Sequence, residues 1–350
     1  MKELKYLNKY LLKYKWKLLL GIIITIISRI FSLFTPKLVG NSMTLIENSI
    51  LNIKQTSDNL EILLARNILI ILFASLVSGF FTFLMRQTII NVSRFIEFDL
   101  KNDIYNHYQS LCPLFYKTNR TGDLMSRITE DVSKVRMYVG PAIMYSINTV
   151  TLFIIVIAFM FSISPSLTIY SLLPLPILSF TIYTLSKKIH SKSTFVQEKL
   201  AKLSTFSQEV FSGIKIIKTF NMQKIVTENF DNLSKSSKRS SISLSKVQAL
   251  FFPLMILLIG ISNIIVIYVG GNQYIDGKIE IGVIAEFIIY ITMLTWPVAV
   301  VGWVTSIIQQ AEASQKRINT FLKTLPSIKN YGKSLNFGSS KITFKNVSFK

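Results

Sequence analysis

The chain has 350 residues, of which half are hydrophobic, with a mean hydropathy of +0.44 and a net charge of +21. The charge alone would suit a nucleic-acid partner, but the basic residues are grouped between long apolar runs, a pattern typical of membrane proteins and not of nucleic-acid binding. Cys112 is the only cysteine, so neither an internal disulfide nor a thiolate metal site is predicted.

Residues 1–17 are predicted to form an amphipathic N-terminal elbow on the membrane surface. They are rich in lysine and carry leucines at helical spacing, namely Leu4, Leu7, Leu11 and Leu12. The following apolar run has no small-residue cleavage site and is interrupted by Arg29, so we expect an uncleaved first helix and not a signal peptide.

Six apolar runs within residues 18–310 are long enough to span a membrane, which takes roughly 17 or more apolar residues. They lie at about 18–39, 62–85, 139–161, 167–185, 249–270 and 283–308. Lysine and arginine gather before the first run, between the second and third, between the fourth and fifth, and after the last. This distribution predicts that both termini and both long connections are cytoplasmic.

The two long connections read as helices and not as loops. No glycine or proline lies between Phe80 and Cys112, and Gly213 is the only such residue between Ile177 and Phe252. A helix from residue 60 to residue 110 would be about 75 Å long, whereas the hydrocarbon core takes up only about 30 Å. We therefore predict an all-α membrane protein whose six spans extend into two long cytoplasmic helical hairpins.

Each predicted hairpin has an apex with turn residues. The first apex is Pro113 to Asp123, where Thr121 or Asp123 can cap the next helix, and the second surrounds Gly213. Both apexes contain apolar side chains that a bare turn would expose to solvent, and such clusters usually mark a partner surface.

These motifs resemble those of ABC exporters. F-Y-K-T-N-R-T-G-D-L-M-S-R-I-T-E-D-V at 115–132 resembles their first coupling loop, and E-V-F-S-G-I-K-I-I-K-T-F at 209–220 resembles their second. A-E-A-S-Q-K-R-I-N-T-F-L at 311–322 is similar to the exit segment that leads into the nucleotide-binding domain. R-M-Y-V-G-P at 136–141 is similar to the bacterial multidrug-exporter-like branch.

The last residues add to the resemblance. Residues 342–349 alternate apolar and polar side chains with period two, which predicts a β-strand. The segment resembles the first strand of an ABC nucleotide-binding domain, so residues 311–340 are predicted as a linker and 341–350 as the start of that domain. Gly332-Lys333-Ser334 looks like the end of a phosphate-binding loop, but Ser327 stands where the first glycine would be, so we interpret it as a linker turn.

The resemblance implies a half transporter that works as a homo- or heterodimer. It implies ATP and Mg²⁺ bound outside residues 1–350, nucleotide-binding domains as partners, membrane lipid around the spans, and no nucleic acid. It also implies residues that couple the hairpins to those domains, namely Phe115, Tyr116, Arg120, Thr121, Gly122, Asp123, Glu209, Gly213, Ile217 and Phe220. The substrate class implied is a small amphiphile, drug-like or lipid, with a peptide as the alternative.

Arg29 and Trp296 are candidate residues of a substrate cavity. Arg29 lies deep in the first span, where a charge faces either a cavity or a partner on a neighbouring helix, and both interpretations stay open. Trp296 precedes Pro297, which is expected to kink the sixth span, as are Pro174 and Pro176 in the fourth. An ion-driven secondary transporter and a signalling scaffold are the competing functions. The first would need buried carboxylates near the midplane, which the predicted spans largely lack.

Overall fold

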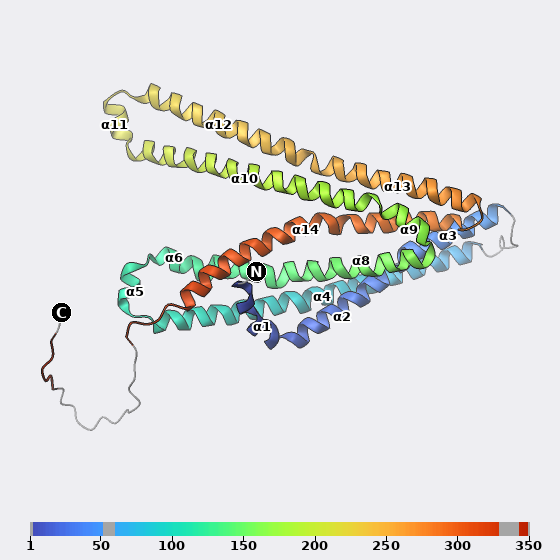
Figure 1. The fold of residues 1–350 in the computed structure, drawn as a ribbon, viewed down its shortest axis with the longest axis horizontal. Coiled ribbons are helices and arrows are strands. Elements are labelled where there is room, and N and C mark those ends of the chain that lie inside the picture. The colour runs from blue at the N-terminus through green and yellow to red at the C-terminus, as the bar shows by residue number, and fades with distance from the viewer. Residues whose placement is uncertain (1–2, 52–59, 329–342, 349–350) are drawn as a thin grey trace.

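The computed structural model describes residues 3–51, 60–328 and 343–348 (Figure 1). Throughout these ranges the regular structure is helical, with no strand. The strand predicted over 342–349 is not shown in its described part: residues 343–348 are irregular, and Asn346 has a left-handed φ of 50°, which breaks an extended chain. A strand also needs a neighbour for its ladder hydrogen bonds, and the described residues supply none. Gly332, Lys333 and Ser334 lie outside the described residues.

Six helical stretches of the described chain are long and apolar enough to cross a membrane, which confirms the predicted number of spans. They are Lys15–Ile50, Leu60–Ser110, Thr121–Ile163, Pro165–Ser212, Gln223–Ile275 and Ile281–Leu322.

The first half of the chain forms the N-terminal segment and the first hairpin. Its elements are η1 (Glu3–Leu7), α1 (Asn8–Lys13), α2 (Lys15–Ser32), α3 (Phe34–Ile50), α4 (Leu60–Ser110), α5 (Pro113–Thr118), α6 (Thr121–Ser126), η3 (Arg127–Asp131), α7 (Val132–Met137), η4 (Tyr138–Ala142) and α8 (Ile143–Ile163). The predicted helix from residue 60 to residue 110 is thus a single helix, because no glycine or proline interrupts its polar half.

The second half forms the second hairpin and the last helix. Its elements are α9 (Pro165–Leu172), α10 (Pro174–Ser212), α11 (Ile214–Thr219), α12 (Gln223–Ala249), α13 (Phe251–Ile275) and α14 (Ile281–Leu322). The helix predicted to be kinked at Pro174 and Pro176 is interrupted at Leu173, between α9 and α10. Helix α14 is continuous through Pro297. Residues 311–322, predicted as the start of a linker, are the last turns of α14.

The first span changes its packing partner where it breaks. Pro36 cannot donate a hydrogen bond to the preceding turn, and the helix is interrupted at Leu33. On one side of the break α2 packs along α4, and on the other side α3 packs mainly against α14. A Cβ on Gly282 would overlap the carbonyl oxygen of Gly40, so these two helices touch through their backbones.

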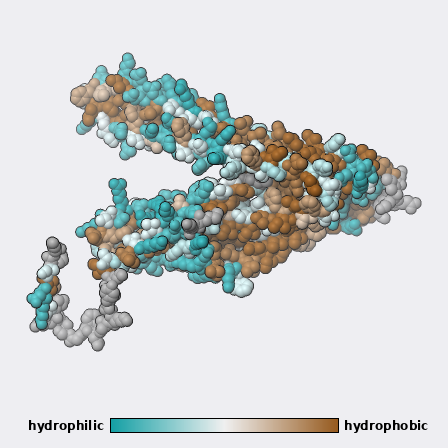
Figure 2. All heavy atoms as spheres, in the orientation of Figure 1, coloured by the Kyte–Doolittle hydropathy of each residue, from teal (hydrophilic) through white to brown (hydrophobic). Residues whose placement is uncertain are grey.

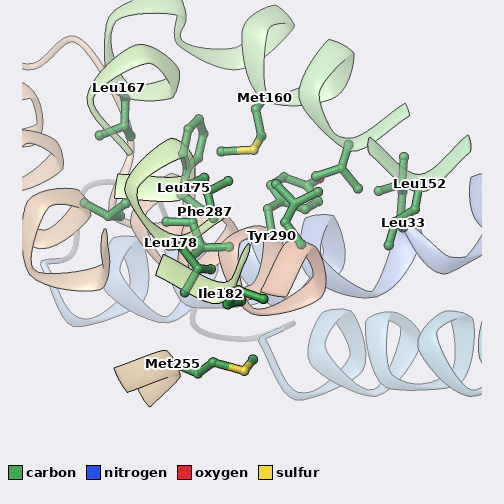
Figure 3. Close-up of a cluster of buried hydrophobic side chains, with 14 residues drawn as sticks. Leu33, Leu152, Met160, Leu167, Leu175, Leu178, Ile182, Met255, Phe287 and Tyr290 are labelled. Atoms are coloured by element: carbon green, nitrogen blue, oxygen red, sulfur yellow. The ribbon is translucent and has the colours of Figure 1, made fainter. Parts of the chain in front are cut away.

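The two hairpins diverge from a common bundle (Figure 1). We call the end with α5 and α11 the hairpin end, and the end where α13 meets α14 the loop end. Hydrophobic side chains cover the part of the molecule toward the loop end, and hydrophilic ones predominate along both hairpins (Figure 2). The bundle core there is a cluster that includes Leu33, Met160, Leu178, Phe287 and Tyr290 (Figure 3).

The N-terminal segment packs on the protein with two of its leucines. Leu4 and Leu7 are 5% and 0% exposed, because they are buried against α4, α7 and α14. Leu12, at 66% exposure, is the leucine of this segment that stays uncovered. An amphipathic pattern identifies an apolar face, but it does not tell whether lipid or protein covers it.

Candidate functional site

The first hairpin is closed by the short helix α5 and the start of α6. Cys112 and Pro113 begin α5, and its Tyr116 hydroxyl donates to the Tyr108 carbonyl oxygen at 2.5 Å. Phe115 packs in the buried cluster with a ring distance of 6.2 Å to Phe321 of α14. The aromatic pair of the tip thus has two roles: Phe115 anchors the tip inward, and Tyr116, 42% exposed, lies at its surface.

The polar residues of the predicted first coupling loop also fall into two groups, those exposed to solvent and those bonded to the rest of the chain. Arg120, Thr121 and Gly122 are exposed, and a Cβ added to Gly122 would meet no atom within 4 Å. The cap predicted for Thr121 or Asp123 is not made, because α6 begins after Arg120 and has no side-chain cap. Nothing within the described chain therefore occupies this side of the tip.

Asp123 faces the other way and joins a charged network with α14. Its carboxylate accepts from Arg127 Nη2 at 2.5 Å and from Arg317 Nη2 at 2.7 Å. Arg317 also lies 3.4 Å from a carboxylate oxygen of Asp131, which is 1% exposed and accepts from Ser314 Oγ at 2.9 Å. The hydrogen bond from Arg127 is the main reason that the pKa of the Asp123 carboxyl lies below its ordinary value.

This network fixes the tip of the first hairpin to α14. The guanidinium of Arg127 lies 5.5 Å from the ring centroid of Phe321, and the Tyr108 hydroxyl donates to the Leu124 carbonyl oxygen at 2.7 Å. Burial raises the pKa of Tyr108 to about 12, so its hydroxyl keeps its proton at neutral pH. Sequence reasoning missed the roles of Asp131, Ser314 and Arg317, although Arg317 lies within the recognised exit segment.

The second hairpin is closed by α11. Gly213 separates α10 from α11, as the sequence predicts, and Asn221 ends α11 with a left-handed φ of 51°. Asparagine tolerates this conformation better than most residues, a signal that was available in the sequence. Glu209 is exposed and its carbonyl oxygen accepts from the Gly213 N–H at 2.9 Å.

The tip of the second hairpin presents apolar side chains to solvent. Ile217 is half-buried, with its carbonyl oxygen accepting from Met222 N–H at 2.9 Å. The surrounding large side chains are exposed by 39% to 74%, namely Phe211, Ile214, Ile216, Phe220 and Met222. A cluster of this kind usually marks a partner surface.

The candidate cavity residues are not brought together. Arg29 Nε donates to Asn148 Oδ1 of α8 at 2.7 Å, which is the neighbouring-helix partner considered for a buried charge. Trp296 is 67% exposed on α14, and in the described chain no recorded hydrogen bond or ring contact links it to Arg29. Glu286 of α14 is 5% exposed and accepts from the Tyr290 hydroxyl at 2.5 Å.

Over the described part of the chain, no group of three or more His, Cys, Asp or Glu side chains could hold a metal ion.

The fold is that of a membrane domain with six spans and two helical hairpins that extend well beyond its apolar zone. Residues 18–298 match the family described as ABC transporter transmembrane region, and the chain belongs to that family. The motifs that pointed to it are the two hairpin tips and the exit segment.

Its relatives include proteins with two kinds of name. The chain is 30% identical over 323 residues to the multidrug resistance-like ATP-binding protein MdlA of Buchnera aphidicola subsp. Baizongia pistaciae, covering 92% of this chain and 54% of that protein. It is 24% identical over 316 residues to MdlA of Escherichia coli, covering 90% and 52%. It is 28% identical over 253 residues to the ATP-dependent lipid A-core flippase of Syntrophus aciditrophicus, covering 72% and 42%. The chain thus spans about half the length of the curated relatives it matches.

Proposed function

We propose that this chain is the transmembrane part of an ATP-driven exporter that works as a dimer of half transporters. It moves amphiphilic compounds, drug-like or lipid, out of the cytoplasm or the inner leaflet by alternating access. ATP and Mg²⁺ bind in nucleotide-binding domains outside residues 1–350, so hydrolysis belongs to the full-length protein.

The observation that carries this proposal is the pair of hairpins with uncovered tips. The 51 residues of α4 correspond to a helix of about 75 Å, and a span takes up only about 30 Å of it. The remainder is a stiff lever whose end, α5, presents exposed groups, and α10, α11 and α12 repeat the arrangement. An ion-driven carrier has no use for two such levers, whereas an exporter moved by nucleotide-binding domains requires them.

The geometry suggests that some of the proposed coupling residues contact the nucleotide-binding domains and that others hold the shape of the tips. Those that are exposed at the tips dock on the nucleotide-binding domains, namely Tyr116, Arg120, Thr121, Gly122, Glu209 and Phe220. Phe115, Asp123, Gly213 and Ile217 hold the shape of the tips, because they contact residues of their own chain.

The orientation and location are part of the proposal. Basic residues gather on the N-terminal segment, on both hairpins and after the last span, which supports a cytoplasmic hairpin end and cytoplasmic termini in the plasma (inner) membrane. A cysteine introduced at Asn272, in a Cys112→Ser background, would then react from outside intact cells, and one at Asn119 would not.

The relatives support drug-like or lipid substrates over a peptide. Those named above are called multidrug resistance-like proteins and a lipid A-core flippase. Trp296 is the better of the two candidate cavity residues, since it is a large exposed aromatic side chain on α14. Arg29 is held by Asn148 and serves first to join α2 to α8.

The test removes apolar groups from each tip in the full-length protein. We expect Phe115→Ala with Tyr116→Ala, and separately Ile217→Ala with Phe220→Ala, to lower the amount of substrate moved per ATP hydrolysed, because burying each such side chain contributes roughly 1.5–3 kcal/mol. The measurement is transport and hydrolysis in the same vesicles. Phe98→Ala with Tyr105→Ala is the matched control, since these exposed aromatic residues lie on α4 away from the tip.

Unchanged stoichiometry in both tip variants would refute the coupling roles. Transport that follows an imposed ion gradient without ATP would refute the exporter and favour the secondary transporter. The 350-residue chain alone is expected to hydrolyse no ATP above background, and turnover lost on Lys333→Ala would contradict this.

A further inference from the structure

The N-terminal segment, residues 3–14, lies against both α4 and the last turns of α14. Leu4, Leu7 and Tyr10 are at most 5% exposed and share one buried cluster with Ile104 of α4 and Phe321 of α14. Helices α4 and α14 touch each other directly at few points, and α7 and η1 fill the space between them. The segment therefore joins α4 to the last turns of α14, beside the direct contacts that α7, η3, η4 and α8 make with α14.

A repeated pair of residues joins the segment to α4. The sequence contains Lys-Tyr dipeptides four residues apart, and α4 carries Asp99 and Asp103 at the same spacing. Lys9 Nζ and the Tyr10 hydroxyl both donate to Asp103, at 2.8 and 2.5 Å. The next turn repeats the arrangement.

In this second turn the acceptor is Asp99. Lys13 Nζ donates to it at 2.8 Å, and the Tyr14 hydroxyl donates to it at 3.0 Å. Four residues make about one helical turn, so the two sets of bonds align in register. Each carboxylate thus receives one charged and one neutral donor.

The other edge of the segment is bonded to α14. Asn319 Nδ2 donates to the Glu3 carbonyl oxygen at 3.2 Å and to its carboxylate at 2.8 Å. Gln315 Nε2 donates to Asn319 Oδ1 at 2.7 Å, which orients that amide. These bonds lie on the part of α14 that also holds Arg317, and through it Asp123 at the hairpin tip.

We propose that residues 3–14 act as a clasp that holds the first hairpin and the end of α14 as one rigid unit. Lys9, Tyr10, Lys13 and Tyr14 are then positioning residues for coupling: a displacement of α14 is passed to the tip of the first hairpin because the two cannot slide past each other. The coupling part rests on the proposed exporter function, whereas the rigid unit does not.

The experiment exchanges the charges across the clasp in the full-length protein. One variant carries Lys9→Glu and Lys13→Glu, a second carries Asp99→Lys and Asp103→Lys, and a third carries all four changes. Spin labels at Asn106 and Lys316, both exposed, report the distance between α4 and α14 in a Cys112→Ser background. Transport per ATP hydrolysed is measured on the same proteins.

We expect each reversed pair to broaden the distance distribution and to lower transport per ATP severalfold, and the fourfold exchange to recover most of both. Lys15→Glu with Lys17→Glu is the matched control. It changes the charge equally, but these lysines lie over the rings of Trp16 and Phe95, at 5.6 and 4.5 Å, and away from the aspartates. The control variant should show the distance distribution and the transport per ATP of the unmodified protein.

Three results would overturn the clasp. The first is a narrow distribution with unchanged coupling in both reversed variants. The second is a fourfold exchange that folds but recovers neither readout. The third is a control that fails equally, because the lysines would then be acting on anionic lipid. If the unmodified protein moves no substrate with ATP, the exporter proposal fails, and the distance measurement still decides whether the rigid unit exists.

Discussion

The two hairpins have the same shape, but the rest of the chain covers them to very different extents. The first packs against the N-terminal segment and α14, with a buried cluster and a charged network that reaches its tip. On α10, α11 and α12, which are described throughout, the buried residues beyond the apolar zone are Val196 and Ser237, and Lys235–Asp231 is the one recorded ion pair. One hairpin is thus stabilised by other parts of its own chain, whereas the described chain leaves most of the other hairpin exposed.

The comparison teaches that exposure has different meanings in the two places. Tyr116 is exposed on a hairpin whose side toward α14 is covered, although Phe98 and Tyr105 are also exposed along α4. Phe195, Phe211 and Phe230 are exposed along the length of the second hairpin. In a dimer, we expect the second hairpin to gain most of its stability from outside the chain.

The largest expected difference comes from deleting an apolar side chain in each hairpin. Ile104 is 0% exposed on α4 and Ile225 is 58% exposed on α12. Ile104→Ala should cost about 2–5 kcal/mol of the free energy of unfolding, and Ile225→Ala less than about 0.5 kcal/mol. Thermal unfolding of the 350-residue chain in detergent checks this, and equal losses would remove the distinction between the hairpins.

The next difference concerns the ion pairs. Arg317→Ala leaves the buried Asp131 carboxylate without its cation, whereas Lys235→Ala breaks an exposed pair within one helix. Arg317 is itself half-exposed, so we expect a loss of about 2 kcal/mol instead of the roughly 3–5 kcal/mol of a fully buried pair, and under about 0.5 kcal/mol for Lys235→Ala. Chemical unfolding in detergent measures both, and a larger loss for Lys235→Ala would contradict the assignment.

A smaller difference is expected on acidification. Burial alone would raise the pKa of the Asp103 carboxyl, but hydrogen bonds from Lys9 and Tyr10 outweigh it and hold the pKa below its ordinary value of 3.8. Its contribution to stability is therefore complete above that value and is lost as the pH falls below it. Hydrogen-exchange protection factors, corrected for the intrinsic pH dependence of amide exchange, should fall around Asp103 of α4 as the pH drops below about 3.8. Protection factors there that rise over the same pH range would reverse the sign.

The smallest expected effect is that of Gly122→Ala. An added Cβ meets no atom within 4 Å, so stability should change by less than about 0.5 kcal/mol. If coupling nevertheless falls in the full-length protein, the glycine is needed for contact with a partner. A loss of stability in the 350-residue chain would show that the tip is more tightly packed than its contacts indicate.

The elements that the sequence predicted well are those specified by nearby residues. The uninterrupted apolar and polar stretch of α4 and the breaks at Pro113, Gly213 and Pro174 are all local signals, and the structure confirms them. The placement of the tips followed from the same signals. Their coupling roles stay predictions.

The missed features depend on residues that are far apart in the chain. The bonds of Lys9 and Lys13 to Asp103 and Asp99 join positions separated by 94 and 86 residues, and the Lys-Tyr repeat gains its meaning only once α4 lies beside it. The spacing of Leu4 and Leu7 in the sequence fits a face covered by lipid as well as one covered by protein. The period-two pattern at 342–349 predicted a strand, but a strand forms only with a partner that the described residues do not provide.

The contact between Glu3 and Asn319 also constrains the order of folding. These residues lie 316 positions apart, so the N-terminal segment must wait for the synthesis of α14 before its packing is complete. Until then Leu4, Leu7 and the α14-facing side of α3 are uncovered, and the early spans must insert without them. A contact of such long range slows folding, and chains whose synthesis stops before α14 would expose these surfaces to quality-control proteases.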